Sequence, residues 1–150
     1  LGWGESLRIN PLDVTLDELR TAIQTKYGYG PQKAGRIAVE IRQFAGLDNG
    51  LKSNDIVWVI GAFAGNQVKP VPIYGVSRVT GEFEWDRGSN WWKFKRQAEI
   101  FPIERALDIE QARKCFGKDA MIETLYTVPS SSFENLRKEL HRAYGVVISI

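Results

Sequence analysis

The chain has 150 residues, of which 43% are hydrophobic and 25% charged, and its formal net charge is +2. This composition is typical of a folded globular protein and excludes a disordered chain or a set of membrane-spanning helices, and the length predicts a single domain over residues 1–150. The only cysteine, Cys115, excludes an internal disulfide and a cysteine-built zinc site, and without a secretory leader we expect a cytoplasmic protein.

Two helices are expected in the first third of the chain. Thr15 and Glu18 form a capping box, in which each side chain bonds to a free backbone amide at the start of a helix. This first helix ends at Gly28, and the residues expected on its apolar face are Leu16, Leu19 and Ile23. The second helix starts at Pro31 and stops at Gly46, and the residues expected on its buried face are Ala34, Ile37, Ala38, Ile41 and Phe44.

The pattern then changes from helical to β. Residues 56–60 are mostly β-branched and predict a strand. A second strand is expected over residues 73–80 and 82–86, with a kink at Gly81. Residues 61–72 contain Gly, Asn and Pro, so we expect a loop between the two strands.

A β-hairpin is expected next. Residues 86–90 have the composition of a turn, which would fold residues 91–100 back as an antiparallel partner strand. Both arms of this hairpin carry aromatic residues. Three of the five tryptophans of the chain, Trp85, Trp91 and Trp92, lie close to Arg87 and three other cations in this segment.

The last third of the chain is mainly helical. A short helix is predicted from Asp108 to about Phe116. Residues 131–134 are expected to cap a longer helix that ends at Gly145 and turns Phe133, Leu136 and Leu140 inward. Residues 146–150 predict either a final strand or a link to a further segment.

No motif indicates catalysis. His141 lies near the end of a predicted helix, where a cation complements the helix dipole, and no motif pairs a base with Cys115 or with a serine. Asp13, Gln24 and Lys26 imitate the spacing of a metal-dependent nuclease, but the last two fall on a predicted helix rather than a strand. A Gly-Lys-Ser/Thr phosphate loop is absent. We therefore expect no catalytic residue, no metal site and no cofactor.

Several motifs occur in an order that resembles a known family. They are Gly2-Trp3-Gly4-Glu5, a helix over Thr15–Tyr27, Gln32 through Phe44, Lys52-Ser53-Asn54-Asp55-Ile56-Val57, Ile73 through Asp86, and Lys95-Arg96-Gln97-Ala98-Glu99-Ile100. This order resembles the N-terminal domains of Mrr-type, modification-dependent restriction endonucleases, which are similar to the EVE, YTH and PUA barrels. The most specific part is the Val-Thr-Gly stretch at residues 79–81 with the alternating acidic and aromatic residues that follow. The resemblance covers residues 1–100 well and the remainder loosely.

This resemblance implies an α+β fold, a small twisted PUA/EVE-like β-barrel flanked by three or four helices. It implies a DNA-binding specificity module of a restriction system that recognises a methylated or otherwise modified base in double-stranded DNA, flipped into an aromatic pocket. Such a module has no enzymatic activity of its own and serves a nuclease or ATPase domain of the same polypeptide. Relatives begin with an additional strand before the Gly-Trp element, so the module is expected to lack that strand. The resemblance also implies that the module is part of a larger restriction protein.

The resemblance and the residue types together nominate a site. The candidates for the base pocket are Trp3, Glu5, Trp58, Phe83, Trp85 and Trp91. The candidates for phosphate contacts are Arg87, Lys93, Lys95 and Arg96. Aromatic rings stack on bases, Glu5 offers an acceptor to an exocyclic amino group, and cations bind phosphates without reporting base identity.

Alternatives to this assignment remain open. Trp58 lies among β-branched residues and fits a barrel core as well as a pocket wall, and at least one of Phe83 and Trp85 is expected in the core. Lys95 and Arg96 also fit a solvated strand edge. An RNA-binding module for methylated adenine, or a protein-interaction domain with an aromatic surface, would use the same residue types. Two departures from the family, Asn54 in place of glycine and Trp91-Trp92 in place of a histidine-rich stretch, bear on the ligand rather than the fold.

Overall fold

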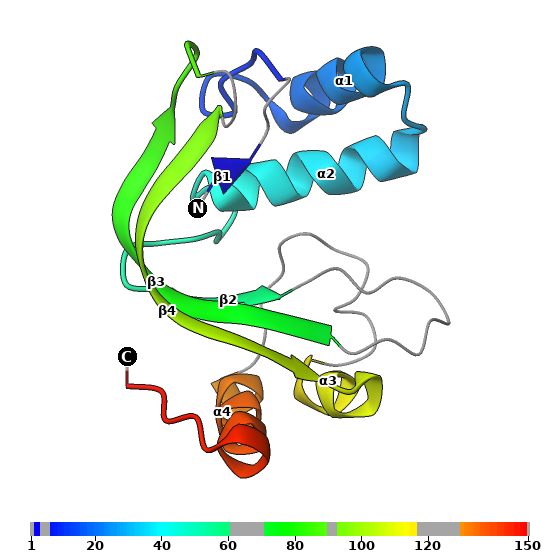
Figure 1. Cartoon of the computed structure of the whole chain (residues 1–150). Coiled ribbons are helices and arrows are strands. Elements are labelled where there is room, and N and C mark those ends of the chain that lie inside the picture. Colours follow the sequence, from blue (N-terminus) through cyan, green and yellow to red (C-terminus); the bar gives the residue numbers. More distant parts are fainter. Residues whose placement is uncertain (1, 4–6, 61–70, 90–92, 117–129, 150) are drawn as a thin grey trace. The chain divides into compact units, whose positions relative to one another are not determined.

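The computed structural model describes residues 2–3, 7–60, 71–89, 93–116 and 130–149. Within these ranges the chain is an α+β protein, which confirms the predicted class. The helices are α1 (Leu16–Tyr27), α2 (Pro31–Phe44), α3 (Ile109–Phe116) and α4 (Ser130–Tyr144). The strands are β1 (Gly2–Trp3), β2 (Ile56–Ile60), β3 (Val71–Trp85) and β4 (Phe94–Leu107), and they form one open sheet in the order β1-β4-β3-β2 (Figure 1). None of the described helices combines the length and apolar character needed to cross a membrane.

The chain divides into two compact units. Unit 1 comprises residues 1–55 and 79–98, and unit 2 comprises residues 56–78 and 99–150. The long strands β3 and β4 therefore each contribute one part to unit 1 and one part to unit 2. That the whole chain behaves as a single domain stays a prediction.

Helices α1 and α2 of unit 1 pack side by side (Figure 1). The capping box of α1 is present, with the Thr15 hydroxyl accepting from the Glu18 amide at 3.3 Å and the Glu18 carboxylate accepting from the Thr15 amide at 2.8 Å. Leu19 and Ile23 are fully buried as predicted, whereas Leu16 is 39% exposed, so the buried face of α1 is narrower than expected. Gly28 ends the helix with a φ of 67°, a conformation that favours glycine.

Helix α2 buries Ala34, Ala38, Ile41 and Phe44 as its apolar spacing predicts. Ile37 is only half-buried. Glu40 also belongs to the buried face of α2, which the apolar pattern did not predict. Its carboxylate lies 3.7 Å from the Arg36 guanidinium. The predicted turn at residues 48–50 is present, and both Asp48 and Asn49 have positive φ.

The hairpin part of unit 1 is built on aromatic contacts. The Phe83 ring lies 6.4 Å from Phe44 and 6.0 Å from Phe94, measured between ring centroids, so strands β3 and β4 are joined to α2 by a cluster of phenylalanines. Strand β1 pairs antiparallel with β4, Gly2 opposite Lys95 and Trp3 opposite Phe94. β3 runs through Gly81 without interruption, and a Cβ there would come within 2.9 Å of the Gln97 side chain, which explains the glycine at this close approach.

Strand β2 confirms the prediction and pairs antiparallel with β3 in unit 2, with a register shift between Val59 and Ile60. Two boundaries in this unit differ from prediction. β3 begins at Val71, so the end of the predicted loop is strand, and residues 61–70 lie outside the described residues. β4 continues to Leu107 instead of ending at Ile100, because Ile103 and Leu107 still face a buried core.

That core lies between the strands and the helices α3 and α4, which pack against each other. Its fully buried members include Leu107, Leu136 and Leu140. Asp108 and Gln111 cap α3 through reciprocal hydrogen bonds of 3.1 and 2.9 Å, as the sequence pattern predicts.

The C-terminal helix and the residues after it correct two predictions. Helix α4 starts at Ser130, so residues 131–134 form its first turn rather than its cap. The helix ends before Gly145, whose φ is 67°. Of the two alternatives predicted for the following segment, the strand is wrong, because residues 146–149 pair with no strand of the described sheet, although Ile148 is buried against the core.

Candidate nucleic-acid interface

The turn of the β3–β4 hairpin is held by Asp86. Its amide donates to the Lys93 carbonyl at 2.8 Å, and its carboxylate accepts from the amides of Gly88 and Ser89 at 3.1 and 3.0 Å. The same carboxylate pairs with the Lys95 ammonium at 2.5 Å. This hydrogen bond from Lys95 is the main reason that the pKa of Asp86 lies below its ordinary value. Residues 86–89 are therefore held by several hydrogen bonds, and Lys95 is already engaged with Asp86.

Lys93 is bonded to the described residues of this turn. Its side chain is almost fully buried, and the ammonium donates to the carbonyl oxygens of Arg87, at 2.8 Å, and of Ser89. These bonds close the turn from inside. Lys93 thus holds the backbone of the hairpin tip, and its burial does not fit the phosphate contact predicted for it.

Arg96 is an internal brace of unit 1. Only 4% of the residue is exposed, and its guanidinium donates to the carbonyl oxygens of Phe44, at 2.7 Å, and Gly81, at 3.2 Å. Burial lowers the pKa of Arg96, while the charges of Glu82 and Asp55 act in the opposite direction. These contacts join α2 to β3 through β4. The phosphate contact predicted for Arg96 therefore does not fit its position either.

The space around Arg96 also explains Gly46, which the sequence pattern treats only as a helix stop. A Cβ on Gly46 would lie 2.6 Å from the Arg96 guanidinium, and the φ of Gly46 is +87°. Glycine is favoured here for both reasons.

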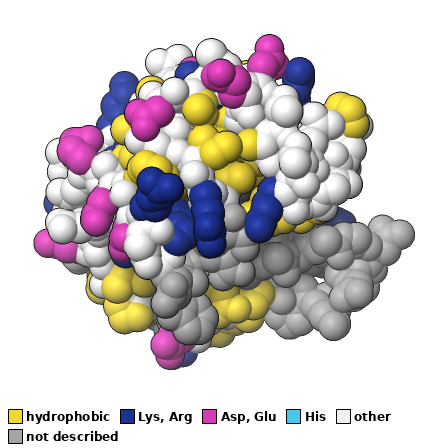
Figure 2. All heavy atoms as spheres, turned by 90° about the horizontal axis from the view of Figure 1, so that it is seen from above, with side chains coloured by type: hydrophobic (Ala, Val, Ile, Leu, Met, Phe, Trp, Pro, Cys, Tyr) yellow, Lys and Arg dark blue, Asp and Glu magenta, His cyan; other side chains and the backbone are white. Residues whose placement is uncertain are grey.

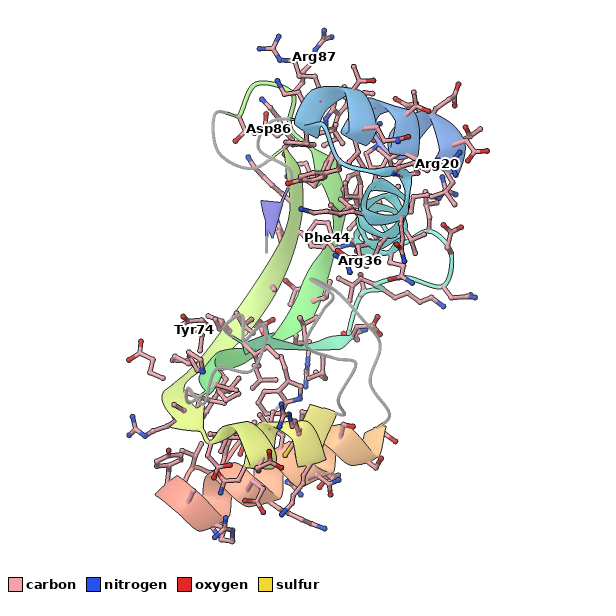
Figure 3. All side chains as sticks on the ribbon, turned by 90° about the vertical axis from the view of Figure 1, so that its right-hand side faces the viewer. Arg20, Arg36, Phe44, Tyr74, Asp86 and Arg87 are labelled. Atoms are coloured by element: carbon pink, nitrogen blue, oxygen red, sulfur yellow. The ribbon has the colours of Figure 1, made fainter. Side chains whose placement is uncertain are left out.

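Arg87 differs from the other three cations of the hairpin. It is exposed at the tip of the turn, where Figure 3 shows its side chain pointing away from the strands. Within the described residues it has no ion pair or side-chain hydrogen bond. Of the four residues predicted to contact phosphates, Arg87 is thus the one presented to solvent with its charge unneutralised.

Two of the predicted pocket aromatics are packing residues. Phe83 lies between Phe44 and Phe94 in unit 1. Trp58 belongs to unit 2, where its ring lies 5.4 Å from that of Phe133 and packs against the apolar core. The alternative of a core role for Trp58 is thus the one that its contacts favour.

Trp85 is the described aromatic residue that best fits a binding role. It is the last residue of β3, half-buried, and directly precedes the Asp86 turn. Its indole N–H, like that of Trp58, is buried and has no hydrogen-bond partner among the described residues, so this feature does not distinguish the two tryptophans. What distinguishes Trp85 is its position beside the turn that carries Arg87.

The remaining predicted pocket residues are placed only in part. The backbone of Trp3 pairs with Phe94 in the sheet, and its side chain is outside the described structure. Glu5 and Trp91 also lie outside the described residues.

A second group of residues was missed by the sequence analysis. Tyr27 and Tyr29 stack with ring centroids 5.5 Å apart and an interplanar angle of 19°, and the Lys33 ammonium lies 3.6 Å from the centroid of the Tyr29 ring. Tyr27 ends α1, Tyr29 lies in the short connection between the helices, and Lys33 belongs to the first turn of α2. Two tyrosines separated by one glycine, with a lysine four residues further on, are the signal that could have drawn attention to them.

Charged side chains are distributed unevenly over the face that Figure 2 shows. Neighbouring Lys and Arg side chains (dark blue) lie near the middle of this face, without Asp or Glu between them.

Among the described residues, no group of three or more His, Cys, Asp or Glu side chains is placed to hold a metal ion. Cys115 is 2% exposed, and burial raises the pKa of its thiol to about 11.

Comparison with protein-family models, with curated proteins and with solved structures finds no match for this chain.

Proposed function

We propose that this chain is a DNA-binding specificity module that recognises a modified base, with Trp85 as the aromatic residue against which the base stacks. The observation that carries the proposal is the position of Trp85, a half-buried aromatic residue at the end of β3 and two residues before Arg87, which makes no ion pair among the described residues. The order of sequence motifs that resembles Mrr-type N-terminal domains supports the same function. In this proposal the described strands belong to a PUA/EVE-type barrel.

The energetics of base recognition are compatible with one aromatic residue of this kind. Extruding a base from a duplex costs a few kcal/mol, least where the base is mismatched or damaged. Stacking on an aromatic side chain returns roughly 1–3 kcal/mol per base.

The four cations of the hairpin have different roles in this proposal. Arg87 contacts a phosphate, whereas Lys93 and Arg96 keep the hairpin in shape and Lys95 contributes through its pair with Asp86. Phosphate contacts fix the position of the protein on the duplex and contribute to its affinity, but they do not distinguish one base from another. A module of this kind acts in a cytoplasmic restriction system and directs a nuclease or ATPase domain of the same polypeptide, without catalysis of its own.

The proposal is tested by titrating labelled duplexes of one sequence that contain cytosine, methylcytosine, hydroxymethylcytosine or methyladenine. The wild-type chain should bind one modified duplex more tightly than the unmodified one, and Trp85→Ala should remove that preference. Tyr74→Ala is the matched control, because Tyr74 is an aromatic residue of unit 2 with 52% exposure (Figure 3). Equal binding of all four duplexes by the wild-type chain would contradict the proposal.

A protein-interaction domain is the second candidate, and one observation favours it. Tyr74 and Ile100 of unit 2 are large apolar side chains that are 52% and 60% exposed. Apolar side chains that a folded protein leaves at its surface are candidates for contact with a partner. A folded chain that binds none of the duplexes at low salt would favour this candidate.

A further inference from the structure

The connection between α1 and α2 exposes its backbone. It consists of Gly28, Tyr29 and Gly30, and a Cβ added to either glycine would meet nothing within 4 Å. Neither glycine is therefore explained by close packing. Gly28 is needed for its φ of 67°, but Gly30 has an extended backbone that any residue could adopt. Two small residues keep the surface here open to an approaching partner.

Two lysines beside this connection carry charges that no carboxylate neutralises. Lys26 lies in the last turn of α1 and Lys33 in the first turn of α2, and neither makes an ion pair within the described part of the chain. The first turn of α2 contains no acidic residue, whereas the acidic residues of α1, Asp17 and Glu18, lie at its opposite end and are bonded to Arg20 and Thr15.

The tyrosines hold one of these charges in place. The Lys33 ammonium lies 3.6 Å from the centroid of the Tyr29 ring, and Tyr29 in turn stacks on Tyr27. A cation–π contact fixes the direction of an ammonium group, and it leaves the net charge available to an anion. It also lowers the entropy lost when a lysine, otherwise highly flexible, binds a ligand.

We propose that this surface, formed by Lys26, Tyr27, Tyr29 and Lys33, is a second DNA contact that binds the phosphodiester backbone of a duplex without regard to base identity. The proposal builds on the proposed function and adds a site outside the β3–β4 hairpin. The charge of this surface indicates the partner. Two cations without ion pairs among the described residues, next to an exposed backbone, suit a polyanion that offers successive phosphates. The first free amides of α2, where Gly30 supplies no side-chain cap, add to the positive potential.

The test is the salt dependence of duplex binding by the double variant Lys26→Ala with Lys33→Ala. Each phosphate contact contributes about 0.9 to the slope of log K against log salt, so losing two should lower the slope by about 1.8. Affinity at low salt should fall roughly tenfold, equally for modified and unmodified duplexes. The modification preference should remain.

The matched control removes the same charge from unit 2. Lys114 and Lys138 are exposed and form no ion pair within the described residues, so Lys114→Ala with Lys138→Ala should leave both affinity and slope nearly unchanged. A further pair of variants tests whether the Tyr29 ring positions the Lys33 ammonium, because both variants leave the charge of Lys33 unchanged. Tyr29→Phe keeps a ring under Lys33 and should bind as the wild type does, whereas Tyr29→Leu should bind about two- to fivefold more weakly, the equivalent of one exposed cation–π contact.

The outcomes distinguish this inference from the proposed function. If the Lys26 and Lys33 double variant keeps the wild-type slope while the wild type still prefers modified DNA, the second contact is refuted and the proposed function stands. If the double variant and the control variant lose affinity equally, the effect is one of net charge and the site is again refuted. If the folded wild-type chain binds no duplex at low salt, both proposals fail together.

Discussion

The two units are stabilised in different ways. In unit 1, charged side chains reach main-chain carbonyls: Arg96 donates to Phe44 and Gly81, and Lys93 to Arg87 and Ser89. In unit 2, the interior is an apolar cluster to which β3, β4, α3 and α4 contribute, and the buried charged residues of the described chain all belong to unit 1. Unit 1 therefore adds hydrogen bonds from buried cations to its apolar packing, whereas the described interior of unit 2 depends on apolar packing.

This difference shows why charge alone is a poor guide to a binding site. Of the four hairpin cations, two are buried braces, one pairs with Asp86, and Arg87 is exposed without an ion pair among the described residues. Arg42 is a further brace, because it donates to Asp48 at 2.7 Å and to the Val14 carbonyl at 3.2 Å. The hydrogen bond from Arg42 also lowers the pKa of the Asp48 carboxyl. A positive residue becomes a candidate for DNA contact only after its internal partners are known.

The largest expected effect is in the core of unit 2. Leu136→Ala removes a fully buried side chain from the cluster and should lower the free energy of unfolding by about 3 kcal/mol. Urea denaturation followed by circular dichroism measures it. Lys138→Ala, on the exposed side of the same helix, should change stability by less than about 0.5 kcal/mol. Comparable losses in both variants would mean that α4 is not packed as described.

The corresponding variant in unit 1 is Arg96→Met. It keeps much of the side-chain volume but leaves the Phe44 and Gly81 carbonyls without their donor, so we expect a loss of about 2–3 kcal/mol. Lys95→Met, which removes a partly exposed ion pair, should cost about 1 kcal/mol or less. A stable Arg96→Met variant that had lost DNA affinity would assign Arg96 to the surface and overturn its role as a brace.

A smaller, pH-dependent effect is expected from Cys115 in unit 2. Its thiol has a pKa of about 11 in the folded chain against an ordinary value of 9.0. The unfolded chain then releases this proton at lower pH than the folded chain, so the contribution of Cys115 to stability falls as pH rises from about 9 to about 11. Urea midpoints at pH 8 and pH 10.5 measure the fall, which should be steeper in the wild type than in Cys115→Ala. Identical pH dependence in the two chains would contradict the burial of the thiol.

Local patterns were sufficient to predict most of the secondary structure. Capping residues at Thr15 and Asp108 and the apolar spacing of α2 act within one or two turns of chain, so they can be read from neighbouring residues. The end of β4 could not be predicted, because Ile103 and Leu107 continue as strand only through a core supplied by α3 and α4. The first turn of α4 was mistaken for its cap because serine is a preferred N-cap residue and the helix begins with three successive serines.

The candidate site was less predictable than the fold. Sequence placed Trp85 and Arg87 near a turn, where the structure also has them. It could not show that Arg96 reaches Phe44, 52 residues away in the chain, or that Trp58 packs on Phe133. Such contacts between distant segments decide whether a charged or aromatic side chain is buried or exposed.

The most direct test of the central claim is the ratio of dissociation constants for an unmodified and a modified duplex of the same sequence, measured for the wild-type chain, Trp85→Phe and Trp85→Ala. If a base stacks on Trp85, the ratio should be well above one in the wild type, smaller in Trp85→Phe and close to one in Trp85→Ala, a loss of about 5- to 150-fold from stacking energy alone. A folded Trp85→Ala chain that retains the full wild-type ratio would contradict the account.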